Sequence, residues 1–264
     1  MSMSDPIERQ DALINGTSKI PQITLAFWVM KICATTLGET GGDLVSMTLK
    51  VGYTMSSIIL VSLFLIALVT QLRSQKFKPV LYWTVILTTS TAGTTMSDFM
   101  DRTLHLGYAK GSLLLVSLLM SVLLLWRLSE DSLSVERIFT RKGELFYWIA
   151  ILFSNTLGTA LGDYLADSSG LGFLGGAMLI SSLLALVVAC HWFTKISPVL
   201  LFWIAFILTR PFGATFGDLL TKPLVKGGLG FGTIGSSAVL FGLLAILVGY
   251  SIKAKNAEGL EPSA

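Results

Sequence analysis

The chain has 264 residues, of which 53% are hydrophobic and 13% are charged, and its formal net charge is +3. Soluble domains carry about a quarter charged residues, so this composition excludes an ordinary soluble globular protein. The two cysteines stand in apolar stretches without metal-type spacing, which indicates buried thiols and disfavours a zinc or copper site built from Cys and His.

In chain order, we expect a polar N-terminal segment (1–20), repeat 1 (21–72), repeat 2 (73–128), a polar linker (129–144), repeat 3 (145–193), repeat 4 (194–252) and a polar tail (253–264). Each repeat contains a polar-striped helix followed by a charge-free run. These runs are residues 55–69, 111–126, 175–190 and 235–250. With its flanks, each run reaches the roughly 20 residues that cross a bilayer.

The repeats share the pattern [FY]-W-x9-G-x4-D-x8-G. Its positions are Trp28, Trp83, Trp148 and Trp203; Gly38, Gly93, Gly158 and Gly213; Asp43, Asp98, Asp163 and Asp218; and Gly52, Gly107, Gly172 and Gly227. The intervals between the tryptophans are 55, 65 and 55 residues, which indicates two successive duplications.

Two spans per repeat mean that every repeat enters the membrane from the same side, so the repeats are parallel. The sequence therefore predicts an all-α membrane protein of eight transmembrane helices. We expect a pseudo-fourfold or two-by-two ring, with polar helices inside and apolar helices outside.

Lysine and arginine predict the orientation. The terminal segments and the loops between repeats carry twelve of them, against five in the loops inside repeats. This bias favours cytoplasmic termini and places the tryptophans near the cytoplasmic interface. The repeat aspartates follow fifteen residues later, about 22 Å further along a helix, toward the outer leaflet.

One face of each first helix is polar. At 100° per residue, the positions 7, 8, 11, 12 and 15 residues after the Trp share this face. Its oxygen-bearing candidates for ion binding are Thr40, Thr95, Asn155, Thr159 and Thr215, beside the four aspartates and Glu39. A second face, 6, 10 and 14 residues after the Trp, carries small residues that allow close helix packing in lipid.

Four aspartates inside a membrane are costly unless they are paired, hydrated or neutral. One interpretation is that each aspartate only ends or caps a helix. The other is that Asp43, Asp98, Asp163 and Asp218 converge and bind a positive ion. With Glu39 and Arg210, the inner stripes carry a formal charge of −4. Carboxylate, hydroxyl and amide oxygens suit hard cations such as Mg²⁺, Mn²⁺ or Ca²⁺.

Repeats 1 and 4 break the symmetry with Glu39 and Arg210, and a closed ring makes these repeats neighbours. We therefore expect an ion pair between Arg210 and Glu39. The alternative is that Arg210 faces the lumen, as a barrier or as a counter-ion for a substrate. Lys31 lies off the polar face, and we expect it to snorkel or to pair locally.

The motifs "LGETGGD", "AGTTMSD", "LGTALGD" and "FGATFGD", each after "FW" or "YW", resemble a bacterial family of membrane proteins built from tandem repeats of unknown function. The resemblance covers residues 20–252. It implies a bacterial inner-membrane protein and no particular activity.

The hypothesis that best fits these residues is a transporter or channel for a cation, either a divalent metal or a proton-coupled ion. The alternatives are a carrier of organic cations or small solutes, and a non-transporting membrane scaffold or sensor. An enzyme is not expected, because the Gly-x-Gly-Asp spacing of intramembrane aspartyl proteases is absent. We expect the lipid bilayer and a cation as partners and no nucleic acid. The sequence leaves open a homo-oligomer, a bound divalent metal and the direction of transport.

Overall fold

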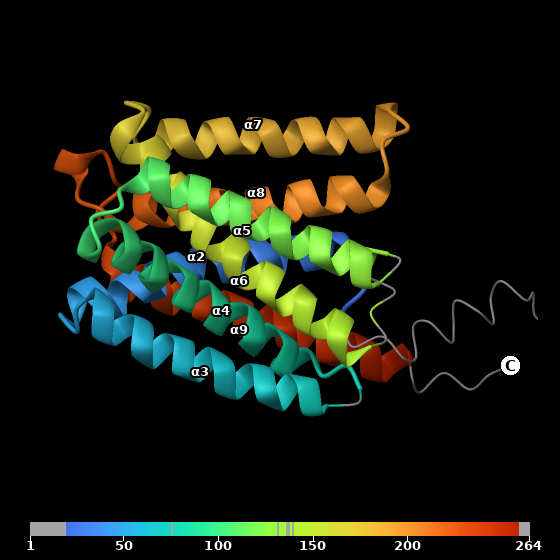
Figure 1. The fold of residues 1–264 in the computed structure, drawn as a ribbon. Helices are drawn as coiled ribbons and strands as arrows, with labels where there is room; N and C mark the ends of the chain where they lie inside the picture. The colour runs from blue at the N-terminus through green and yellow to red at the C-terminus, as the bar shows by residue number, and fades with distance from the viewer. Residues whose placement is uncertain (1–19, 75, 131, 136–137, 139, 259–264) are drawn as a thin grey trace, which may run out of the picture.

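The computed structural model describes residues 20–258 except 75, 131, 136–137 and 139. The predicted N-terminal segment therefore lies almost wholly outside the described residues, as does the end of the tail. The described part contains eight long α-helices and no strand (Figure 1). They are α2 (Leu25–Asp43), α3 (Tyr53–Arg73), α4 (Pro79–Asp98), α5 (Tyr108–Ser129), α6 (Arg141–Asp163), α7 (Gly172–Phe193), α8 (Pro198–Thr221) and α9 (Gly232–Glu258). The prediction of an all-α chain with eight helices is confirmed.

Six of these helices, α3 and α5 to α9, are long and apolar enough to cross a membrane. The chain is thus compatible with a bilayer. The helices α2 and α4 have 19 and 20 residues but carry many Thr, Gly and acidic residues. Membrane crossing by all eight helices stays a prediction.

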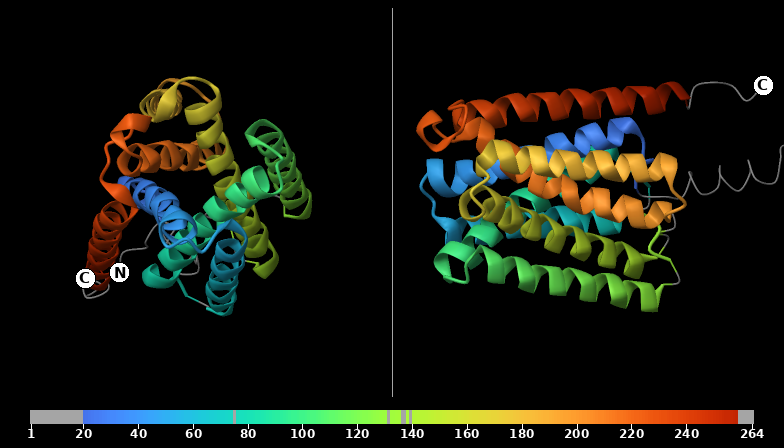
Figure 2. Two further views of the ribbon diagram at one scale, coloured as in Figure 1. Left: turned by 90° about the vertical axis from the view of Figure 1, so that its left-hand side faces the viewer. Right: turned by 90° about the horizontal axis from the view of Figure 1, so that it is seen from above.

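The four polar-striped helices form a closed cycle of contacts: α2 packs on α4, α4 on α6, α6 on α8, and α8 on α2 (Figure 2, left). Each apolar helix covers the polar-striped helix of the following repeat. Thus α3 packs on α4, α5 on α6 and α7 on α8, and α9 returns to cover α2. Solvent preference explains which helices lie inside and which lie outside. The polar stripes lie inside, and the apolar helices present their large side chains outward, for example Ile66 and Leu113.

The glycine ten residues after each Trp explains how closely the inner helices approach. A Cβ on Gly38 would collide with Ser90, one on Gly93 would lie 2.9 Å from the Cβ of Asn155, and one on Gly213 would lie 2.9 Å from the Cβ of Thr35. In the same way, a Cβ on Gly158 would collide with the side chain of Arg210. Each glycine therefore accepts the side chain seven residues after the next repeat's Trp. Because equivalent residues meet at equal register, the four inner helices run parallel to one another.

The aromatic pairs close one end of this bundle. Each Trp packs on the aromatic residue that precedes the Trp of the neighbouring repeat. The ring centroids are 5.8 Å apart for Trp83 and Phe27, 5.6 Å for Trp148 and Tyr82, 6.3 Å for Trp203 and Tyr147, and 5.7 Å for Trp28 and Phe202. Trp83, Trp148 and Trp203 are buried within the bundle. Neighbouring helices approach closely there and cover these indoles, while the depth of the tryptophans in a membrane stays a prediction.

Beyond the first three repeat aspartates, the helices continue for one π-helical turn, at Leu44–Thr48, Phe99–Thr103 and Tyr164–Ser168. None of these aspartates makes a side-chain capping bond. The last glycine of each repeat has positive φ, between 68° and 82°, a conformation that glycine adopts without strain. In the first three repeats the chain turns there into the next helix, whereas Gly227 lies five residues before α9.

Candidate functional site

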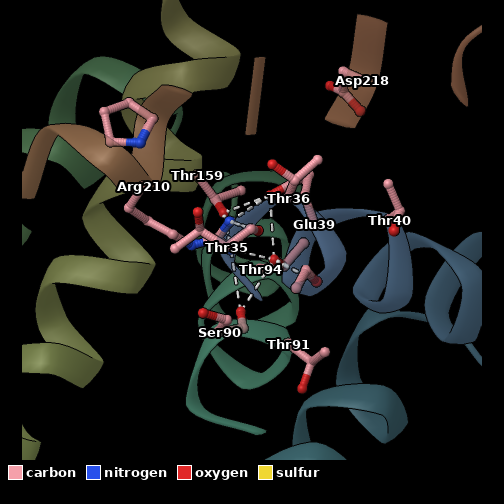
Figure 3. Close-up of polar contacts among 12 residues, drawn as sticks. Thr35, Thr36, Glu39, Thr40, Ser90, Thr91, Thr94, Thr159, Arg210 and Asp218 are labelled. Atoms are coloured by element: carbon pink, nitrogen blue, oxygen red, sulfur yellow. Dashed lines mark hydrogen bonds and ion pairs between the residues drawn. The ribbon is translucent and has the colours of Figure 1, made fainter. Parts of the chain in front are cut away.

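Arg210 occupies the middle of the inner bundle, and its side chain is fully buried. Its guanidinium donates hydrogen bonds to the backbone oxygens of Thr35 on α2, at 3.0 Å, and Ser90 on α4, at 3.1 Å. It also donates to the hydroxyls of Thr94 on α4 and Thr159 on α6 (Figure 3). One side chain from α8 is thereby bonded to the other three inner helices.

Glu39 is the counter-ion of Arg210. Its Oε2 lies 3.3 Å from Nη1 of Arg210, and both side chains are almost completely buried. The hydroxyls of Thr94 and Thr159, which accept from Arg210, donate onward to the same Oε2 at 3.2 and 3.0 Å. The predicted ion pair is therefore present. It closes the cycle between repeats 1 and 4, and its polar partners offset the cost of removing two charges from water.

The four repeat aspartates lie on the far side of this network from the aromatic end, and they share two basic side chains. Arg102 lies 2.8 Å from Asp98 and 3.2 Å from Asp163. In the same way, Lys222 lies 2.6 Å from Asp43 and 3.0 Å from Asp218. Each base bridges its own repeat and the next repeat in the cycle.

The two bases differ in their surroundings. Arg102 lies beside the rings of Tyr53 and Tyr108, 5.7 and 5.9 Å from their centroids, and donates to the Tyr53 hydroxyl. Lys222 lies just past the end of α8 and contacts the carboxylates of Asp43 and Asp218. Among the described residues, no aromatic ring is recorded in contact with it. Burial disfavours the charge on Lys222, but the carboxylates of Asp218 and Asp43 outweigh it and raise the pKa of the ammonium. Lys222 therefore stays charged at neutral pH.

Three acids from three helices converge. Glu39 of α2, Asp163 of α6 and Asp218 of α8 each place one carboxylate oxygen within 4.8 Å of the others, and all three side chains are buried. This spacing suits shared ligation of one hard cation, whose oxygen ligands lie about 2.0–2.6 Å from the ion. The prediction that all four repeat acids form one cluster needs correction. Asp163 and Asp218 approach Glu39, whereas Asp43 and Asp98 are not in this group of three.

Three of the predicted oxygen ligands point elsewhere, and this part of the prediction is wrong. Thr40 bonds to Ser237 of α9 at 2.8 Å, and the methyl of Thr215 packs toward Gly176 of α7. Thr95 donates only to carbonyls of its own helix. These residues stand twelve positions after the Trp, which is 100° from the inward position eleven. Figure 3 shows Thr40 apart from the network that holds Thr159.

Asn155 lies between α4 and α6, as the close approach of its Cβ to Gly93 requires. Its side chain is fully buried, yet neither its amide nitrogen nor its oxygen has a hydrogen-bond partner among the described residues. Asn155 therefore belongs to the bundle interior, but the structure does not join it to the carboxylates.

Two bases of the site, Arg102 and Lys222, are absent from the candidates that the sequence predicts, since both count among the five basic residues of the loops inside repeats. Their spacing was a usable signal, because each stands four residues after a repeat aspartate, where helical side chains meet. Including them corrects the charge of the acidic region. The ion pairs join five carboxylates to three basic side chains, so the formal excess among these groups is two negative charges.

The comparison with known families agrees with this fourfold construction. Residues 26–77, 81–132, 146–197 and 201–256 each match the family described as Repeat of Unknown Function (DUF347). The chain belongs to this family. The four matched segments correspond to the four helix pairs, each with one inner and one outer helix. No curated protein and no solved structure matches the chain.

Proposed function

We propose that this protein moves a cation across a membrane, with the buried acids Asp43, Asp98, Asp163, Asp218 and Glu39 as its binding groups. The observation that carries the proposal is a network of ion pairs in which five buried carboxylates share three basic side chains, a formal excess of two negative charges. A buried charge without a counter-ion is costly in a membrane, so cations or protons are expected to balance it. Oxygen ligands favour a hard divalent ion such as Mn²⁺ or Mg²⁺ as substrate.

The group formed by Glu39, Asp163 and Asp218 is the best candidate for the ion-binding position. Its oxygens come from three helices and approach within 4.8 Å. In the structure each acid is also paired with a base: Glu39 with Arg210, Asp163 with Arg102, and Asp218 with Lys222. An entering cation would compete with these bases for the same oxygens. The three ion pairs therefore act as the barrier that a cation must open.

The proposal includes eight membrane-crossing helices, in a parallel ring with both termini in the cytoplasm of a bacterial inner membrane. Polar α2 and α4 are covered by other helices, so they can cross without exposing their Thr-rich faces to lipid. The exposed faces of α3, α5, α7 and α9 are rich in Leu, Ile and Val, as a lipid-facing layer requires.

Reconstituted vesicles test the proposal directly. We expect the wild-type protein to carry Mn²⁺ or Mg²⁺ into vesicles that contain a metal-sensitive dye. The variants Asp163→Asn and Asp218→Asn should lose most of this flux, because each removes a charged ligand from the group of three. Asp167→Asn is the matched control, because Asp167 is an exposed carboxylate four residues past Asp163.

Equal flux in the wild type and both ligand variants would refute the assignment of the site. Absence of flux for every tested cation, together with unchanged metal content in cells that produce the protein, would refute transport. Membrane yield of each variant controls for loss of the protein itself.

A second candidate function, a non-transporting scaffold or sensor, is favoured by one observation. Arg210 and Glu39 make a closely bonded centre without any described contact to solvent. A scaffold needs such a centre only for stability. Neutralising both residues together would then leave every cellular effect of the protein intact, whereas transport requires the acids.

A further inference from the structure

Lys31 of α2 is a buried amine that no part of the mechanism above uses. Its side chain is completely buried, and its Nζ has no hydrogen-bond partner among the described residues. Its Nζ lies over an aromatic ring, 3.9 Å from the ring centroid of Phe206 on α8. Complete burial shows that the expectation of snorkelling is wrong, and the local partner of Lys31 is the ring of Phe206.

The surroundings of Lys31 are apolar at its own level of the bundle. It stands three residues after Trp28, and the equivalent residues of the other repeats are Ile86, Ile151 and Phe206, all buried. This apolar layer separates the aromatic end from the network of Arg210. A lysine is the one polar side chain among four equivalent positions.

The helices that pack on α2 offer no counter-ion to Lys31. On α8 the group that faces it is Arg210, whose positive charge opposes a second one nearby. On α4 the stretch from Trp83 to Thr95 carries no charged side chain, and its titratable neighbour Tyr82 is bonded to Tyr147 of α6. The stretch of α9 from 233 to 252 is also uncharged, and its only titratable side chain, a tyrosine, is exposed.

The layer next to Lys31, about one helical turn further along the axis, holds other polar atoms without partners. They are the hydroxyl of Ser90, both side-chain atoms of Asn155 and the Nε of Arg210, all buried. Buried groups of this kind are usually satisfied by internal water. Water there would connect the amine of Lys31 with the polar centre of the bundle.

We propose that Lys31 is a proton-binding site inside the bundle, whose amine takes up a proton from water to become an ammonium and releases it again. A permanent ammonium in this place would stand near Arg210 with only the face of the Phe206 ring as its partner, which is costly in a low-dielectric interior. If the side chain at this position were always neutral, an apolar residue such as the isoleucine of repeats 2 and 3 would pack there equally well. Reversible protonation accounts for a lysine here.

Arg210 links this site to the acids. When a cation binds Glu39, it replaces part of the negative charge that balances Arg210. The field of Arg210 at Lys31 then grows, and the ammonium is disfavoured. Cation binding should therefore release the proton of Lys31, and by reciprocity protonation of Lys31 should weaken cation binding. This coupling rests on the proposed cation transport, whereas the proton site itself does not.

Nitrogen NMR of protein labelled on the lysine side chains tests the proton site by itself. Lys31→Met removes one signal and so identifies it, and Lys110→Met, at an exposed lysine, is the control. We expect the Lys31 signal to change between its amine and ammonium positions within the pH range in which the protein stays folded. A signal that stays at the ammonium position, or at the amine position, throughout that range would overturn the proposal.

Proton release tests the coupling. In weakly buffered solution with a pH dye, Mn²⁺ should release more protons from the wild type and from Lys110→Met than from Lys31→Met. Equal release from Lys31→Met, with unchanged Mn²⁺ affinity, would overturn the coupling. If the wild type binds no cation by calorimetry, the proposed function fails and the coupling fails with it, and the NMR experiment still decides the proton site.

Discussion

Replacing Arg210 by methionine is the most informative perturbation of the bundle centre. Methionine keeps most of the length and apolar volume but removes every donor. In the variant, Glu39 remains buried with its hydroxyl neighbours and without its cation. The acceptor oxygens of Thr35 and Ser90 also lose the guanidinium that they bind.

The magnitude follows from these contacts. Removing one partner of a buried ion pair typically costs about 3–5 kcal/mol, because the other charge stays uncompensated. Glu39→Gln should cost less, about 1.5–3 kcal/mol, because Arg210 retains its carbonyl and hydroxyl acceptors. The double variant removes both charges, so its loss should be smaller than the sum of the single losses by about 2 kcal/mol or more.

The assay is the free energy of unfolding in mixed micelles, measured for the wild type, both single variants and the double variant. A large positive coupling between the two residues supports the central ion pair. Losses that simply add, or a methionine variant as stable as the wild type, would show that the pair does not stabilise the centre. Retained helicity of each variant at low denaturant ensures that the same folded state is compared.

Two further predictions concern the packing and the outer bases. Gly213→Ala should destabilise the bundle by about 1–3 kcal/mol, because the added Cβ would lie 2.8 Å from the backbone and hydroxyl of Thr35. Gly242→Ala, which meets nothing within 4 Å, should be neutral or slightly stabilising in the same unfolding measurement. Lys222→Met should lower the melting temperature in the absence of divalent cations, because it leaves Asp218 and Asp43 without their shared base. Added Mn²⁺ should restore the melting temperature. A melting temperature that does not respond to Mn²⁺ in this variant would contradict an ion-binding role for Asp218.

The spacing of the repeat predicted the helices and their packing faces well, for a physical reason. A glycine ten residues after each Trp lies on a fixed face of a helix, and such a face is useful only where another backbone approaches. Gly38 and Gly93 meet Ser90 and Asn155 in this way. Periodicity defines a face and not its partner, however. It could not show that each apolar helix covers the inner helix of the next repeat.

The errors within the site have a common origin in the width of the predicted polar face. The sequence predicts five positions as one inward stripe, but the position twelve residues after the Trp turns away from the centre. Arg210, at position seven, and Glu39, at position eleven, lie within it. Thr159 therefore joins the network, while Thr40 and Thr215 turn toward outer helices. The omission of Arg102 and Lys222 has a different cause. Counting basic residues by loop does not consider that a side chain just past a helix can reach back to an aspartate four residues earlier.

The two outer bases divide the four repeats into two kinds. Repeats 2 and 4 carry a base four residues after the aspartate, whereas repeats 1 and 3 carry Met47 and Asp167 there. Each base bridges forward to the next repeat, so repeats 2 and 3 form one half and repeats 4 and 1 the other. The charges therefore follow a two-by-two arrangement on a backbone of nearly fourfold packing.

The candidate ion position lies where these two halves of the bundle meet. Asp163 belongs to the first half, and Asp218 and Glu39 belong to the second, yet their oxygens come within 4.8 Å of one another. A cation at this position would join the two halves, since no base described in the structure bridges Asp163 to Asp218. Relative movement of the halves would then change the distance between its ligands. Under the proposed function, cation affinity therefore depends on how the halves are placed, which is the relation that transport by rocking of repeat pairs requires.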